Sequence, residues 1–198
     1  MKKRVGVLIS GTGSNMKALV SAGRKAASPF EVVCVVSNTP DADGIAWARE
    51  QGIATKVINH KDFATREAFD TALNAYLQSQ HLDLIACAGF MRIMTPVLIT
   101  HWAGRMVNIH PSLLPLYKGL HTHQRAIEAG DKEAGCSVHF VTTELDGGPV
   151  IAQARVPILA GDTPETLAAR VLVEEHKLYP KMLGEIISLI QKEHLIIV

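Results

Sequence analysis

Short apolar runs alternate with longer mixed segments through the first half of the chain. The runs are rich in Val, Ile and Leu, which is typical of strands buried on both faces of a parallel sheet. They predict strands over residues 4–10, 31–37, 54–58, 82–88 and 105–109. The segments between them begin with residue types that cap helices, at Ser14, Asp43, Thr65 and Thr95. This alternation predicts an α/β fold with a doubly wound, mostly parallel sheet and helices on both faces.

The pattern changes in the C-terminal third. Residues 137–141 and 150–156 have the composition of strands, and Asp146-Gly147-Gly148-Pro149 between them is a strong turn signal. We therefore expect antiparallel strands in this part of the sheet. A long helix is predicted to begin near Thr163-Pro164-Glu165-Thr166, with proline in its first turn and an acid near its positive end. The apolar tail at residues 194–198 predicts a short final strand.

Composition narrows the class of protein. Of the 198 residues, 47% are hydrophobic and 20% are charged, which excludes intrinsic disorder and fits one domain over residues 1–198. Lys and Arg number 20 and Asp and Glu number 19, a formal net charge of +1. This near-neutral balance argues against a broad nucleic-acid or anionic-membrane surface, because both need clustered positive charge.

Targeting signals and cysteine frameworks are not apparent. The apolar run at residues 5–9 is too short for a signal peptide, and no stretch approaches the ~18 apolar residues that span a bilayer. The widely spaced Cys34, Cys87 and Cys136 predict buried, reduced thiols rather than a zinc site or disulfides. We expect a cytoplasmic protein.

The first candidate for chemistry is Ser10-Gly11-Thr12-Gly13-Ser14-Asn15, where the first strand turns into the first helix. Glycines allow close backbone approach, and free N–H groups at a helix N-terminus favour an anion such as phosphate. The sequence is neither a Rossmann fingerprint, since Met16 replaces the third glycine, nor a Walker A loop. The alternative is an ordinary glycine turn with a serine cap.

The second candidate is Asn108-Ile109-His110-Pro111 at the end of the fifth strand. Residues two apart on a strand face the same side, so Asn108 and His110 should present an amide and an imidazole together. Ligands of such sheets bind beyond the carboxyl ends of the strands, and this pair suits stabilisation of an oxyanion. The alternative is a hydrogen-bonded structural pair.

The third candidate, Asp146, lies in the predicted Asp-Gly-Gly turn. A carboxylate beside a histidine favours its imidazolium form and fixes its orientation, but Asp-Gly-Gly alone more often marks only a turn. Two further segments are weaker candidates. His121-Thr122-His123 lacks a completing metal motif, and residues 90–94 could line a pocket for a flat ligand.

Together these motifs resemble the phosphoribosylglycinamide (glycinamide ribonucleotide) formyltransferase family. The resemblance covers nearly the whole chain through five segments in order, with Glu175-His176 and Tyr179-Pro180 similar to the family's closing helix. The segments are Ile9-Ser10-Gly11-Thr12-Gly13-Ser14-Asn15, Ala88-Gly89-Phe90-Met91-Arg92-Ile93, Asn108-Ile109-His110-Pro111-Ser112-Leu113-Leu114-Pro115, Ser137-Val138-His139-Phe140-Val141 and Leu145-Asp146-Gly147-Gly148-Pro149.

The resemblance implies a Rossmann-like formyltransferase fold and assigns site residues. The implied catalytic residues are Asn108, His110 and Asp146. The implied ribonucleotide site comprises Gly13, Ser14, Asn15 and Glu175. The implied folate site comprises Arg66, Met91, Arg92, Ile93, Met94, Asn108, Thr142, Thr143, Glu144, Leu145 and Asp146. Leu172 and Val173 depart from the family pattern, because polar side chains are expected in that ribonucleotide-binding stretch.

The implied reaction is formyl transfer from 10-formyltetrahydrofolate to the amino group of glycinamide ribonucleotide, in de novo purine biosynthesis and without a metal. The alternatives are a formyltetrahydrofolate hydrolase, a methionyl-tRNA formyltransferase and a catalytically silent binding module. The first usually carries an additional N-terminal domain and the second a C-terminal one. The expected partners are small molecules, not nucleic acid or membrane, and either a monomer or a homodimer is compatible with the sequence.

Overall fold

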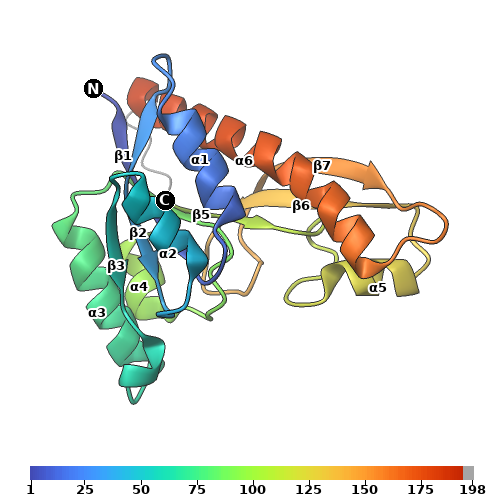
Figure 1. Ribbon diagram of the computed structural model, residues 1–198, viewed down its shortest axis with the longest axis horizontal. Coiled ribbons are helices and arrows are strands. Elements are labelled where there is room, and N and C mark those ends of the chain that lie inside the picture. Colours follow the sequence, from blue (N-terminus) through green and yellow to red (C-terminus); the bar gives the residue numbers. More distant parts are fainter. Residues whose placement is uncertain (194–198) are drawn as a thin grey trace.

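The fold is that of a computed structural model, which describes residues 1–193 (Figure 1). The first half of the chain contains β1 (Lys3–Ile9), α1 (Ser14–Gly23), β2 (Phe30–Ser37), α2 (Asp43–Glu50), β3 (Ala54–Val57), the 3-10 helix η1 (His60–Asp62), α3 (Arg66–Ser79), β4 (Leu84–Cys87) and α4 (Pro96–His101). The second half contains β5 (Met106–His110), α5 (Thr122–Glu128), β6 (Glu133–Phe140), β7 (Val150–Pro157) and α6 (Pro164–Glu193). The strand predicted at residues 194–198 lies outside the described residues.

All seven strands form one sheet in the order β3-β2-β1-β4-β5-β6-β7. The neighbouring pairs from β3 to β5 are parallel, whereas β6 is antiparallel to both β5 and β7. This arrangement confirms the predicted α/β class and the antiparallel strands of the C-terminal third. The register places Asn108 directly opposite His139.

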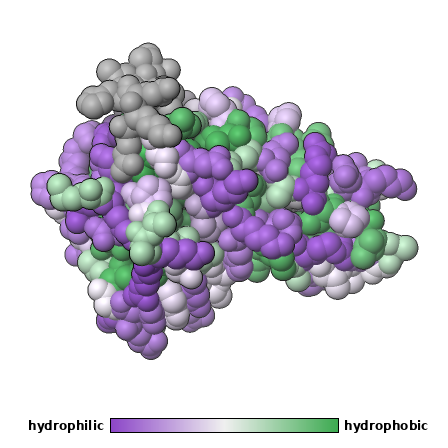
Figure 2. All heavy atoms as spheres, turned by 90° about the horizontal axis from the view of Figure 1, so that it is seen from above, coloured by the Kyte–Doolittle hydropathy of each residue, from purple (hydrophilic) through white to green (hydrophobic). Residues whose placement is uncertain are grey.

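Helices cover both faces of the sheet, and each face buries its own apolar cluster. Successive residues of β1 belong to different clusters. Val7 packs with α1 and α6 on one face, and Leu8 packs with α3 and α4 on the other. Figure 1 shows α6 running the length of the molecule beside α1, with α5 near its beginning. The space-filling view shows a broad body that tapers towards one end, where hydrophilic and hydrophobic residues are interspersed (Figure 2).

Several boundaries differ from the prediction for local physical reasons. Thr65 caps α3 as predicted, its hydroxyl accepting the Ala68 N–H. Ser14 and Asp43 are not caps, because Gly13 in a left-handed conformation and Ala42 occupy those positions. Thr95 precedes α4 without capping it, and the buried Asp70 carboxylate accepts its N–H.

Two further differences concern the second half of the chain. The sixth strand begins at Glu133, four residues before the predicted start, because the chain pairs with β7 along this whole length. The short α5 was not predicted as an element. Within residues 1–193, no helix combines the length and apolar character needed to cross a bilayer. The three cysteines are buried as free thiols, and burial raises the pKa of Cys87 to about 12.

Candidate active site

The end of β5 presents Asn108 and His110 on one side of the strand, as their spacing predicts. The His110 ring meets a carboxylate from a distant part of the chain. Asp146 Oδ2 lies 3.4 Å from His110 Nδ1, and the two side chains are only 7% and 10% exposed. Asp146 is thus in contact with His110. Their separation in the sequence did not indicate whether the two side chains would meet.

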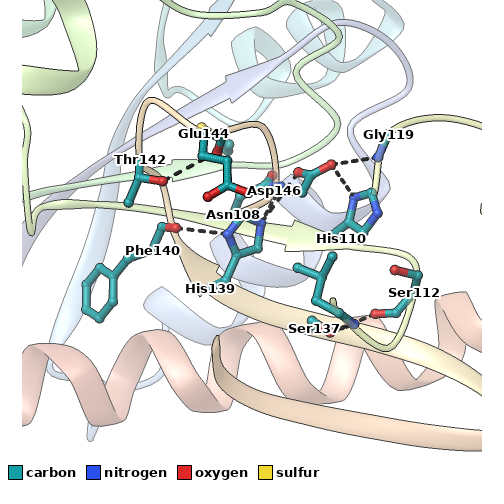
Figure 3. A network of polar contacts seen from close by, with 12 residues as sticks. Asn108, His110, Ser112, Gly119, Ser137, His139, Phe140, Thr142, Glu144 and Asp146 are labelled. Carbon is teal, nitrogen blue, oxygen red and sulfur yellow. Dashed lines mark hydrogen bonds and ion pairs between the residues drawn. The ribbon is translucent and has the colours of Figure 1, made fainter. Parts of the chain in front are cut away.

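Backbone geometry holds Asp146 in this position (Figure 3). Its φ of 48° lies in the left-handed region, which few residues other than glycine, asparagine and aspartate adopt. The Gly119 N–H donates to Asp146 Oδ2 at 2.9 Å, so the loop after β5 contributes to the site. Gly148 has no room for a side chain, because a Cβ there would lie 1.9 Å from the Phe140 carbonyl oxygen.

His139 completes the cluster, and its role was not assigned from the sequence. Its Nδ1 lies 2.9 Å from the Phe140 carbonyl oxygen, and Asn108 Nδ2 lies 3.1 Å from its Nε2. A carbonyl can only accept and an amide nitrogen can only donate, so His139 is a neutral ring with its proton on Nδ1. Burial lowers the pKa of His139, and the bond to the Phe140 carbonyl and the nearby Asp146 carboxylate partly offset that effect.

The second nitrogen of His110 is also occupied. Its Nε2 lies 3.0 Å from the carbonyl oxygen of Tyr117, so the ring donates to the loop that follows β5. Asp146 and the Tyr117 carbonyl are both acceptors, an arrangement that matches a ring protonated on both nitrogens. His139 lies in one of the segments that carry the family resemblance, but its role becomes visible only in the antiparallel register of β5 and β6. No sequence signal indicated Tyr117 or Gly119.

A pocket opens beside this cluster. Its apolar wall includes Phe90, Ile93 and Met94 after β4, and its opposite side is the segment 142–146. The full lining is Cys87, Phe90, Arg92, Ile93, Met94, Ile99, Asn108, His139, Val141, Thr142, Thr143, Glu144, Leu145 and Asp146. All predicted folate-site residues line it except two: Arg66 is exposed at the start of α3, and the Met91 side chain is 68% exposed.

The predicted ribonucleotide residues form a second cluster at the turn between β1 and α1. Gly13 has a φ of 69°, Ser14 begins the helix, and Asn15 is buried in its first turn. Asn15 Nδ2 donates to the Glu175 carboxylate of α6 at 2.6 Å. Burial raises the pKa of Glu175, and the Asn15 bond partly offsets that effect. The four residues are therefore brought together, as the resemblance implies.

Close packing of backbone against backbone shapes this turn. The Gly44 N–H donates to the Gly11 carbonyl at 3.1 Å, and a Cβ on Gly13 would lie 3.3 Å from Gly44 Cα. That Cβ would also lie 2.7 Å from the Met16 methyl carbon. Gly44 was not identified from the sequence, because only the packing of α2 against the turn reveals its role.

The structure also locates the two histidines His121 and His123 and the two positions that depart from the family pattern. His121 immediately precedes α5, and His123 lies in its first turn, where burial lowers its pKa. Among residues 1–193, no group of three potential metal-binding side chains of His, Cys, Asp or Glu gathers. On α6, Leu172 is half-buried and Val173 is 52% exposed.

Comparison with known proteins identifies the family. The formyl transferase family model matches residues 3–183. Over 178 residues the chain is 50% identical to the phosphoribosylglycinamide formyltransferase of Escherichia coli, covering 90% of this chain and 84% of that protein. The chain belongs to the phosphoribosylglycinamide formyltransferase family.

Solved structures and multifunctional relatives agree with this assignment. The crystal structure of phosphoribosylglycinamide formyltransferase from Brucella melitensis superposes with a TM-score of 0.91, at 52% identity over 95% of this chain and 97% of that one. The chain is also 48% identical to the trifunctional purine biosynthetic protein adenosine-3 of Drosophila melanogaster. It covers 14% of that protein, so this formyltransferase family member corresponds to one part of a longer relative.

Proposed function

We propose that this chain transfers the formyl group of 10-formyltetrahydrofolate to the amino group of glycinamide ribonucleotide in de novo purine biosynthesis. The observation that carries the proposal is the cluster of Asn108, His110 and Asp146: His110 contacts Asp146, and Asn108 and Asp146 line a pocket with an apolar wall. Family membership supports the reaction, and the cluster supplies groups suited to a tetrahedral, negatively charged intermediate.

Formyl transfer needs no enzyme nucleophile, because the substrate amine attacks the formyl carbon directly. The bond from that carbon to the folate nitrogen then breaks, and the proton lost by the amine is matched by the one gained by the folate nitrogen. Asn108 has two amide protons, of which one is directed to His139 and the other is available to the developing oxyanion. His139 thereby fixes which way the Asn108 amide points.

His110 is proposed to stabilise the same oxyanion and to assist proton transfer, with Asp146 keeping its ring charged and oriented. In the structure its Nε2 proton is directed to the Tyr117 carbonyl. Donation of that proton to a substrate requires this bond to break.

The donor fits the pocket chemically. Phe90, Ile93 and Met94 offer apolar surface for a flat ring, and the backbone of residues 142–146 offers hydrogen-bonding groups to the ring's polar edge. We assign Arg92, Ile93, Met94, Asn108 and residues 142–146 to folate binding on this basis. Arg66 and Met91 remain predictions from the resemblance, since neither lines the pocket.

The acceptor is assigned to the turn at residues 13–15. Backbone N–H groups at the beginning of α1 suit the ribonucleotide phosphate. The buried Glu175 carboxylate, held by Asn15, offers an acceptor to a hydroxyl of the ribonucleotide. Leu172 and Val173 provide no polar side chain, so contacts there are limited to the backbone. Holding both substrates at one sheet edge supplies the proximity that a bimolecular reaction needs.

We propose a single domain over residues 1–198, a cytoplasmic location and small-molecule partners. The protein is proposed to act without a metal, as a monomer or a homodimer, and to bind neither nucleic acid nor a membrane. The near-neutral net charge of +1 supports this choice of partners.

Consumption of the formyl donor with and without glycinamide ribonucleotide tests the proposed function. Consumption should be slow with the donor alone and accelerate strongly when the ribonucleotide is added. Fast consumption that the ribonucleotide does not change would support the hydrolase instead. Absence of consumption in both conditions would support a binding module.

A further inference from the structure

Ser10 connects the two substrate regions by hydrogen bonds that the reaction itself does not use. Its N–H donates to the Gly89 carbonyl at 3.0 Å, and its Oγ accepts the Met91 N–H at 2.7 Å. The Ser10 hydroxyl donates in turn to Asn38 Oδ1 at 2.5 Å. One residue at the start of the ribonucleotide turn thus holds two positions of the loop that begins the folate pocket.

The geometry of the sheet explains why a hydroxyl is needed here. Pairing between β1 and β4 continues past the strands through the Ala88 N–H to the Leu8 carbonyl. The chain then turns away at Gly11, whose carbonyl accepts from Gly44. The Ser10 carbonyl, the next acceptor of the ladder, accepts the Thr39 hydroxyl at 3.1 Å, and the Ser10 side chain accepts the Met91 N–H in its place.

Asn38 sets the direction of that acceptor. It lies just beyond β2 and is only 2% exposed, so its amide is fixed within the protein. Because the Ser10 proton is directed to Asn38 Oδ1, the oxygen lone pairs remain for the Met91 N–H. A serine acts as donor and acceptor at once, which alanine cannot do and threonine can.

We propose that Ser10 is a positioning residue for formyl-folate binding: with Asn38, it fixes the backbone of residues 89–91 and so places the wall formed by Phe90 and residues 92–94. This inference rests on the proposed function. A residue next to the ribonucleotide-binding turn thereby affects the affinity for folate. Met91 contributes through its backbone, which agrees with the outward exposure of its side chain.

The test compares ligand affinities of Ser10→Ala and wild type by isothermal titration calorimetry, with tetrahydrofolate and glycinamide ribonucleotide as separate probes. Loss of one hydrogen bond of ordinary strength should raise the tetrahydrofolate Kd about three- to tenfold. The ribonucleotide Kd should change less than about twofold, since Ser10 contacts the turn only through the backbone. Exchange of the Met91 amide, followed by NMR, should become faster in the variant.

Matched variants separate positioning from general damage. Ser37→Ala removes another buried hydroxyl from the same region, one that bonds the Thr39 carbonyl at 2.8 Å and does not touch residues 89–91. It should leave the tetrahydrofolate Kd unchanged. Ser10→Thr keeps the hydroxyl and should restore affinity, and Asn38→Ala should weaken tetrahydrofolate binding in the same direction as Ser10→Ala.

The outcomes distinguish the two proposals. If the wild type binds tetrahydrofolate and turns over but Ser10→Ala binds it equally well, the positioning role is wrong and the proposed function stands. An equal rise in both Kd values, or the same rise in Ser37→Ala, would also overturn it. Should Ser10→Ala fail to fold, Asn38→Ala decides by the same criteria, because it removes the acceptor of the Ser10 hydroxyl proton. A wild type that binds neither probe contradicts the proposed function itself.

Discussion

The turn at residues 10–15 and the loop at residues 142–149 both lie beyond strand ends, but different interactions shape them. The turn follows a parallel strand and leads straight into α1, with Gly13 at a φ of 69° where the chain reverses. The loop connects two antiparallel strands and depends on partners far away in sequence. Asp146 reaches His110 and Gly119, which belong to the segment around β5.

This difference separates binding from chemistry. The turn offers backbone N–H groups and one buried pair, Asn15 with Glu175, and these suit recognition of a phosphate and a sugar. The loop brings a carboxylate between two histidine rings, which suits charge stabilisation and proton transfer. Variants at residues 13–15 should therefore raise the KM for the ribonucleotide, and variants of His110 or Asp146 should lower kcat.

The largest effect is expected around the loop. Asn108→Ala or His110→Ala should lower kcat roughly a hundredfold or more, the scale for loss of an oxyanion donor or an acid–base group. Steady-state kinetics with both substrates varied measures the change, and circular dichroism verifies that the fold is retained. Turnover close to wild type in either variant removes that residue from the mechanism.

A smaller and different effect is expected in the turn. In Gly13→Val the new side chain would meet the Met16 methyl at 2.7 Å and the Gly44 backbone at 3.3 Å, and it would occupy a left-handed position. The ribonucleotide KM should rise about tenfold while kcat changes less.

Gly52→Ala is the matched control, because Gly52 also has a positive φ, of 73°, but a Cβ there meets nothing within 4 Å. It should cost about 1 kcal/mol of stability and leave both KM values unchanged. If Gly13→Val instead lowers kcat with an unaltered ribonucleotide KM, the assignment of the turn to ribonucleotide binding is contradicted.

The smallest predicted effect is a lowered pKa of His139. Burial lowers the pKa of His139, so its midpoint should fall below the ordinary value of 6.5 when followed by NMR. The folded protein then binds fewer protons than the unfolded chain below that pH. The contribution of His139 to stability is present above pH 6.5 and is lost as the pH falls through the lowered pKa. A midpoint above 6.5 would show that His139 is not the neutral acceptor for Asn108.

The same contrast explains how far the sequence could predict the structure. The strands, the turn and the shared face of Asn108 and His110 depend on local spacing, and all three were predicted. The contact of Asp146 with His110 depends on how the loop folds back across the sheet, so from residue patterns it remained a hypothesis. His139 requires the antiparallel register opposite Asn108. The role of Gly44 and the Ser10–Asn38 hydrogen bond both depend on how separate elements pack together, and no local sequence pattern indicates that packing.

The fate of the formyl carbon tests the central claim most directly. The protein is supplied with glycinamide ribonucleotide and 10-formyltetrahydrofolate labelled with ¹³C in the formyl group, and the products are followed by NMR. If the turn and the loop together bind both substrates for direct transfer, the label appears on the ribonucleotide amine as a formamide. Label that accumulates as free formate at the same rate, with the ribonucleotide amine unlabelled, would contradict the account.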